Sequence, residues 1–238
     1  MIDAGVRGIL LDIEGTTTPI AFVHDVLFSY ARAHASDFLK NNIGSDAVRD
    51  DVSMLYEEHA LDVVKDHNPP ELNEEIESLA SYIEWLIDHD RKSTGLKSLQ
   101  GKIWRKGYLD GSLKSQVFED VAPAFQRWRA AGLKVSIFSS GSVLAQQLLF
   151  AHTNAGDLTR FIDSYFDTNT GKKGEAESYR RIAAEMGLEP GEIMFVSDVI
   201  EELDAAEEAG MKTRLSVRHG NPIQAPTHHQ AIESFDAL

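Results

Sequence analysis

The sequence of 238 residues contains no cysteine, which excludes disulfide bonds and zinc sites built from cysteine. Its apolar runs are far too short to span a bilayer, so we expect no transmembrane segment. The start of the chain lacks the basic region, apolar stretch and cleavage site of a signal peptide. We therefore expect a cytoplasmic protein.

Basic residues are scarce relative to acidic ones. The chain has 23 Lys and Arg against 38 Asp and Glu, a formal net charge of −15. Nucleic acids and anionic membranes are therefore poor partners, because both are polyanions. A phosphate-bearing substrate would need local positive charge from a metal ion, a lysine or the N-terminus of a helix.

The first third of the chain combines one strand with a long helical region. Residues 7–12 form a short apolar run that ends in a carboxylate, which is typical of a buried strand. The clearest helix that follows carries Leu79, Ile83 and Leu86 at steps of three and four. Nothing from residue 20 to about 115 alternates like a strand. The pattern predicts an all-helical insert over 20–119 within a core formed by 1–19 and 120–238.

The rest of the chain alternates between strands and helices. Strands are predicted at 133–138, 164–167, 193–196 and 213–217, with helical patterns between them. This order predicts an α/β fold with a Rossmann-like core, in which a parallel sheet lies between two layers of helices. The tail from Asn221 onward, rich in proline and histidine, is expected to be irregular, and its histidine pair is expected to be incidental.

Polar side chains follow the predicted strands. Asp12 ends the first, Ser139 and Ser140 follow the second, a lysine pair follows the third and Asp198 follows the fourth. Ligands of open parallel sheets bind outside the carboxyl ends of the strands, so these segments are expected to meet. A carboxylate can attack phosphorus, carboxylate oxygens suit Mg²⁺, and hydroxyls with helix N–H groups can hold phosphate.

These motifs, in this order, resemble the haloacid dehalogenase superfamily and, within it, the enolase-phosphatases. The superfamily's first motif is normally Asp-x-Asp-Gly-Thr. Here it is Asp12-Ile13-Glu14-Gly15-Thr16, and glutamate at the second position is what the enolase-phosphatases show. The other matching stretches are Phe138–Val143, Tyr165–Thr168 with Lys173, Ser197–Val199 with Glu202, and Ala205–Gly210.

The resemblance implies a role for each matching residue. Asp12 resembles the nucleophile and a Mg²⁺ ligand, and Glu14 matches a metal-binding position that is also a candidate acid/base. Lys173 matches the catalytic lysine, which also contacts the substrate, and Asp198 matches the remaining metal ligand. Ser139 and Ser140 resemble the residues that bind the substrate phosphate. Glu202, one helical turn after Asp198, is a candidate to hold a metal-bound water.

The resemblance also implies a reaction. The substrate would be 2,3-diketo-5-methylthiopentyl-1-phosphate, which is enolised and then dephosphorylated to the acireductone in methionine salvage. One Mg²⁺ per subunit would act as Lewis acid and stabilise the enolate. The helical insert would be the cap of such enzymes, and the family expectation is a monomer.

Three other functions compete with this interpretation. The nearest is a Mg²⁺-dependent phosphatase or mutase of the same fold that acts on another small phosphate ester. A 2-haloacid dehalogenase needs no metal and would leave Asp198 and Glu14 without a task. A phospho-acceptor signalling domain also uses a strand-end aspartate, but such modules are much shorter and have no use for a large helical insert.

Overall fold

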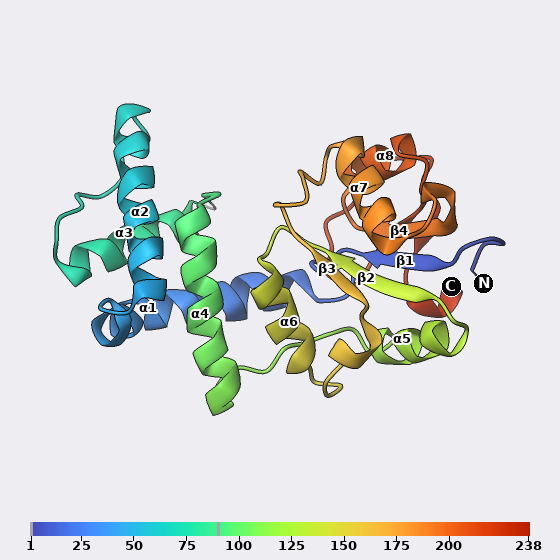
Figure 1. The fold of residues 1–238 in the computed structure, drawn as a ribbon, viewed down its shortest axis with the longest axis horizontal. Helices are drawn as coiled ribbons and strands as arrows, with labels where there is room; N and C mark the ends of the chain where they lie inside the picture. Colours follow the sequence, from blue (N-terminus) through green and yellow to red (C-terminus); the bar gives the residue numbers. More distant parts are fainter. Residues whose placement is uncertain (1, 90) are drawn as a thin grey trace. The chain divides into compact units, whose positions relative to one another are not determined.

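The computed structural model describes residues 2–89 and 91–238, which divide into two compact units (Figure 1). One unit joins the residues up to Val23 with Lys114–Leu238, and the other is His24–Leu113. The unit bounds thus differ by a few residues from the sequence-based bounds of 20–119. Residues 114–119 lie in the first unit because Ser115 N–H donates to the His152 carbonyl and Phe118 N–H to the Thr17 carbonyl.

The first unit is built on a parallel six-stranded sheet, which confirms the predicted α/β fold class. The strand order is β3-β2-β1-β4-β5-β6, and every neighbouring pair is parallel. The strands are β1 (Gly8–Leu11), β2 (Lys134–Phe138), β3 (Ser164–Phe166), β4 (Ile193–Ser197), β5 (Lys212–Ser216) and β6 (Ala231–Ile232). Figure 1 shows helices α5 and α6 on one face of the sheet and α7 and α8 on the other. These helices are α5 (Val121–Ala130), α6 (Val143–Ala151), α7 (Ala176–Met186) and α8 (Ile200–Glu208).

Strand β1 lies at the point where the direction of winding reverses. Its four residues are all buried, as expected for an apolar strand with neighbours on both sides and helices on both faces. Leu11 pairs in register with Ile137 of β2 and with Val196 of β4. The carboxyl ends of the three strands therefore lie side by side, at the place where open α/β sheets bind their ligands.

The C-terminal tail is more ordered than its composition predicts, so the expectation of an irregular tail is wrong at its end. β6 extends the sheet beside β5, and Phe235 is fully buried with its ring 5.3 Å from that of Trp128. The Arg218 guanidinium donates to the Asp120 carboxylate at 2.7 Å and to the Glu233 carbonyl at 3.0 Å. Contacts between residues far apart in sequence hold this segment, and local turn residues do not reveal them.

The second unit consists of helices joined by turns and loops, and its described residues contain no strand. A π-helix, Phe22–Phe28, begins in the last residues of the first unit's N-terminal part and leads into α1 (Ser29–Asn42). The other helices are α2 (Asp46–Val64), α3 (Ile76–Asp88) and α4 (Thr94–Asp110). The face predicted from the spacing of Leu79, Ile83 and Leu86 on α3 is buried. These residues join one apolar cluster with side chains from the other three helices, so burial of amphipathic faces holds the unit together.

An ionic network centred on one buried carboxylate also crosses the helical unit. Asp62 on α2 accepts hydrogen bonds from His67 at 2.8 Å and from Tyr82 at 2.9 Å, and it is paired with Arg91. Burial alone would raise the pKa of Asp62, but the two hydrogen bonds and the Arg91 charge outweigh it and lower the pKa. The ionised carboxylate is therefore the form that stabilises the fold.

Asp62→Asn is expected to lower the free energy of unfolding by about 2–4 kcal/mol at pH 7, since it breaks a largely buried pair whose Arg91 partner is partly exposed. Because folding lowers the pKa, this contribution is complete above the ordinary value near 4 and is lost as the pH falls below it. Urea unfolding followed by circular dichroism from pH 7 to pH 3 measures both effects. Glu57→Gln, an exposed acid on the same helix, is the control and should change little. Equal urea midpoints for Asp62→Asn and Glu57→Gln would contradict the stabilising role of the Asp62 carboxylate.

Candidate active site

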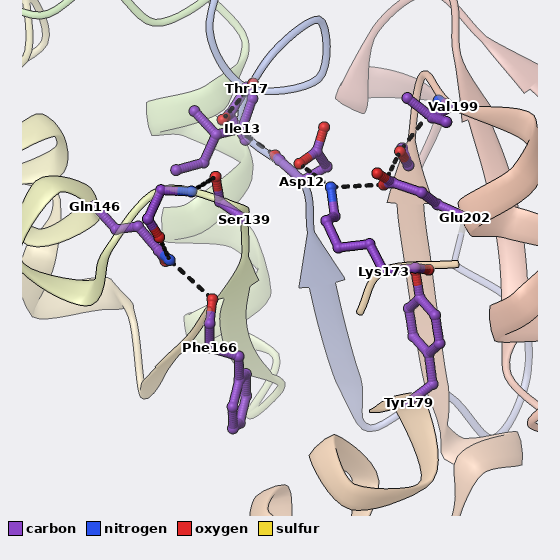
Figure 2. Close-up of polar contacts among 12 residues, drawn as sticks. Asp12, Ile13, Thr17, Ser139, Gln146, Phe166, Lys173, Tyr179, Val199 and Glu202 are labelled. Atoms are coloured by element: carbon purple, nitrogen blue, oxygen red, sulfur yellow. Dashed lines mark hydrogen bonds and ion pairs between the residues drawn. The ribbon is translucent and has the colours of Figure 1, made fainter. Parts of the chain in front are cut away.

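Four of the predicted site residues lie together at the carboxyl edge of the central strands. Asp12 follows β1 and is only 5% exposed, Ser139 follows β2, and Asp198 follows β4. Lys173, from the segment between β3 and α7, reaches this edge and places its ammonium 2.6 Å from Oδ1 of Asp12 (Figure 2). The fold thus brings together groups that are up to 186 positions apart in the sequence, from 12 to 198.

Lys173 lies between two carboxylates. Its Nζ is 2.6 Å from Asp12 and 2.6 Å from Glu202, and Figure 2 shows it between the two acids. Burial alone would lower the pKa of Lys173, but the charges of Asp12 and Glu202 outweigh it and raise the pKa. The hydroxyl of Tyr179 on α7 donates to the Lys173 carbonyl at 2.7 Å, which fixes the backbone. The lysine is therefore a fixed positive charge.

Glu202 is paired with Lys173, a contact that its expected role of holding a metal-bound water does not include. It lies in the first turn of α8, where its Oε2 accepts hydrogen bonds from Lys173 and, at 2.9 Å, from the Ser197 hydroxyl. Burial raises the pKa of Glu202, and the nearby Asp12 charge raises it further. In the structure Glu202 therefore orients the lysine, which in turn faces Asp12.

Asp198 lies in a position that disfavours a negative charge. Its pKa is raised to about 7, first by burial and then by the charges of Asp12 and Glu202, which outweigh the effect of Lys173. Three carboxylates, Asp12, Asp198 and Glu202, therefore share this buried space with Lys173, whose ammonium contacts Asp12 and Glu202. The surplus negative charge and the oxygen-only donor set fit a hard divalent cation such as Mg²⁺.

The loop after β1 packs directly against Asp198. Gly15 has a left-handed backbone (φ +67°), and a side chain at this position would overlap the Asp198 carboxylate. Asn221 donates to the Gly15 carbonyl at 2.9 Å and lies 3.5 Å from Oδ2 of Asp198. Glycine is therefore required both for the backbone conformation and for this close approach. The sequence around Asn221 is typical of an irregular tail and does not predict this contact.

Glu14 lies on the same loop. Glu14 is half-buried, and its backbone forms an isolated β-bridge with that of Thr18. In the part of the chain that the structure describes, the side-chain oxygens of Asp12, Glu14 and Asp198 do not all lie within 4.8 Å of one another. Neighbouring residues hold the side chains of Asp12 and Asp198 in place. The conformation of the loop that carries Glu14 therefore determines whether Glu14 can join them as a metal ligand.

The segment after β2 leads to a helix N-terminus. Ser139 is half-buried and its hydroxyl accepts a hydrogen bond from Gly141 N–H at 3.2 Å, whereas Ser140 is exposed. Ser142 caps α6 by accepting from Ala145 N–H at 3.3 Å. Hydroxyl groups next to a helix N-terminus form an environment that favours phosphate oxygens.

Gln146 holds this segment in place and was not identified from the sequence. It is buried on α6, and its side-chain amide donates to the Gly141 carbonyl at 2.9 Å and to the Phe166 carbonyl at 2.8 Å (Figure 2). It thereby ties the segment after β2 to the end of β3. The available signal was a glutamine inside an otherwise apolar helical run, Val143–Ala151.

Comparisons with known proteins identify the family of this chain. The family model for haloacid dehalogenase-like hydrolases matches residues 6–210. Enolase-phosphatase E1 of Synechococcus elongatus is 52% identical over 100% of this chain and 99% of its own length. The enzyme of that name from Drosophila mojavensis is 46% identical over 100% of this chain and 97% of its own length. The crystal structure of the UTR4 protein of Saccharomyces cerevisiae has a TM-score of 0.80 at 34% identity and covers 98% of this chain and 100% of its own.

The family match spans the strand ends that carry Asp12, Ser139, Lys173 and Asp198, and the relatives match this chain along its whole length. The chain therefore belongs to the haloacid dehalogenase-like hydrolases and, among them, to the enolase-phosphatase E1 family.

Proposed function

We propose that this enzyme converts 2,3-diketo-5-methylthiopentyl-1-phosphate to the acireductone 1,2-dihydroxy-3-keto-5-methylthiopentene and phosphate, a step of methionine salvage. The observation that carries the proposal is the buried Asp12 carboxylate held 2.6 Å from the Lys173 ammonium at the end of the central strand. The names of the relatives support the substrate, and the site supports the phosphoryl transfer.

The proposed transfer begins with Asp12. One of its oxygens attacks phosphorus, the bond from phosphorus to the substrate oxygen breaks, and an aspartyl-phosphate forms. Water then attacks this intermediate, releases phosphate and restores the carboxylate. Lys173 neutralises charge on both the nucleophile and the phosphoryl group, and Ser139 and Ser140 with the N-terminus of α6 bind the phosphate oxygens. Glu14 is the proposed group that gives a proton to the leaving oxygen and later takes one from water.

Magnesium is the proposed cofactor. Asp12 and Asp198 would hold it, together with Glu14. The ion would act as a Lewis acid toward the phosphoryl oxygens and the diketone. We assign the helical unit His24–Leu113 the role of the cap, which would read the part of the substrate that carries no phosphate.

Phosphate release from the diketo phosphate, together with the appearance of enediol absorbance, tests the proposal. Both signals are expected with Mg²⁺ and should be lost after chelation with EDTA and restored by added Mg²⁺. A hexose phosphate assayed in parallel should be turned over much more slowly. Faster turnover of the sugar phosphate would favour the alternative of a phosphatase for another small ester and would overturn the substrate assignment.

Magnesium affinity is expected to depend on pH in a defined direction. Asp198, whose pKa lies at about 7 in the metal-free protein, is protonated below that value and must lose the proton to bind a cation. The dissociation constant should therefore rise by up to about tenfold per pH unit below about 7. Isothermal titration of Mg²⁺ at pH 8, 7 and 6 measures this rise. Equal dissociation constants at pH 8 and pH 6 would be incompatible with Asp198 as a ligand.

A further inference from the structure

The first unit contains a second group of side chains that are able to bind a metal ion. Unlike the carboxylates near Lys173, this group includes two histidines. Among the described residues, Asp204, His228 and His229 each offer one ligand atom, and these atoms all lie within 4.8 Å of one another. Asp204 lies on α8, and the histidines belong to the segment between β5 and β6. Glu207 lies one turn further along α8, with its carboxylate 2.6 Å from Nε2 of His228. Two imidazoles and the Asp204 carboxylate therefore meet at one place, and Glu207 reaches it through its contact with His228.

His229 has the environment of a fixed metal ligand. Its side chain is fully buried, its Nε2 lies 3.0 Å from Asp204, and its Nδ1 lies 2.8 Å from the Thr213 hydroxyl on β5. A hydroxyl can either donate to Nδ1 or accept from it. When a cation takes Nε2, the ring proton can move to Nδ1 and be donated to Thr213. Such a hydrogen bond behind the ring is what orients metal-bound histidines.

The remaining groups leave the cluster open to solvent. The side chains of Asp204, Glu207 and His228 are 55%, 51% and 63% exposed, so a cation can reach them without unfolding the core. A tetrahedral ion with bonds of about 2.0–2.2 Å needs its ligand atoms closer together than 4.8 Å. Rotation of the exposed side chains can supply this movement while His229 stays in place.

From these contacts we propose a second metal site, formed by Asp204, His228 and His229 with Glu207, that binds a divalent transition-metal ion such as Zn²⁺. Imidazole nitrogen suits Zn²⁺, Ni²⁺ and Cu²⁺, whereas Mg²⁺ prefers oxygen ligands throughout. The two carboxylates balance the charge of a divalent ion bound by neutral imidazoles. The ion would tie the segment between β5 and β6 to α8. The inference does not depend on the proposed reaction.

Titration of Zn²⁺ into untagged protein saturated with Mg²⁺ tests the site, because Mg²⁺ would occupy the oxygen-rich catalytic position proposed above, the only point at which the test uses the proposed function. We expect one Zn²⁺ per chain and, at about 100 times the dissociation constant, a rise in Tm of about 5–10 °C. Titration with Co²⁺ should give the visible absorption of a tetrahedral centre with nitrogen ligands.

His228→Gln and Asp204→Asn, both at exposed positions, should each weaken Zn²⁺ binding at least about tenfold, and Thr213→Val should weaken it about tenfold through His229. His219→Gln, an exposed histidine in the same part of the chain, is the matched control and should leave binding unchanged. The proposed site would be overturned if Zn²⁺ did not bind one-to-one with a dissociation constant below 100 µM. Equal Zn²⁺ affinity of the wild type and His228→Gln would also overturn it. These side chains would then only hydrogen-bond the segment between β5 and β6 to α8.

Discussion

Replacing Asp12 by asparagine is expected to reduce phosphate release by roughly 10⁴-fold or more, as removal of an attacking group does in other enzymes that use covalent catalysis. The amide has nearly the shape of the carboxylate but cannot form the aspartyl-phosphate. Lys173 keeps its second partner, Glu202, 2.6 Å away. The variant should therefore fold and should differ from the wild type mainly in chemistry.

Two further measurements make the Asp12 prediction specific. Borohydride reduction of the wild type quenched during turnover should convert an aspartyl-phosphate at residue 12 to homoserine, which mass spectrometry detects, and Asp12→Asn should give no such product. Glu201→Gln, an exposed acid next to Glu202, is the matched control and should retain activity within about twofold, as surface substitutions away from the site usually do. Full activity of Asp12→Asn, or trapping at another residue, would exclude Asp12 as the nucleophile.

The strand-end rule explains how much of this site could be predicted from the sequence. Each short apolar run ended in a polar residue, and in a parallel sheet all those ends meet at one edge. This geometry depends only on strand direction and order, so it placed Asp12, Ser139 and Asp198 together although no local contact links them. The order itself, with β1 between β2 and β4, is not encoded locally.

The supporting residues could not be predicted because their roles arise from distant contacts. Asn221 contacts the Gly15 carbonyl 206 positions away, and Arg218 reaches Asp120 across 98 positions. Asparagine and arginine in a proline-rich stretch are typical of a solvated loop, and only the docked tail gives them buried partners. Glu202 was found by helical spacing from Asp198, but its pairing with Lys173 depends on how the segment before α7 returns to the sheet.

Lys173→Met is the second substitution with a large expected effect. It shortens the side chain by one atom and removes the ammonium that faces Asp12 and Glu202. Two buried carboxylates then lose their partner, so the free energy of unfolding should fall by about 3–5 kcal/mol. Catalysis should fall by about 10²–10³-fold, because the charge that stabilises the attacking carboxylate and the phosphoryl group is lost.

A matched control and a double variant separate these two effects. Lys172→Met changes the neighbouring lysine, whose side chain is 83% exposed and pairs with exposed Glu175, so neither stability nor activity should change much. Adding Glu202→Gln to Lys173→Met removes one uncompensated negative charge and should recover much of the lost stability. It should not recover activity, because the phosphoryl group still meets no ammonium. Recovery of both by the double variant would show that Lys173 only balances charge in the folded core, and that another group stabilises the transferred phosphoryl.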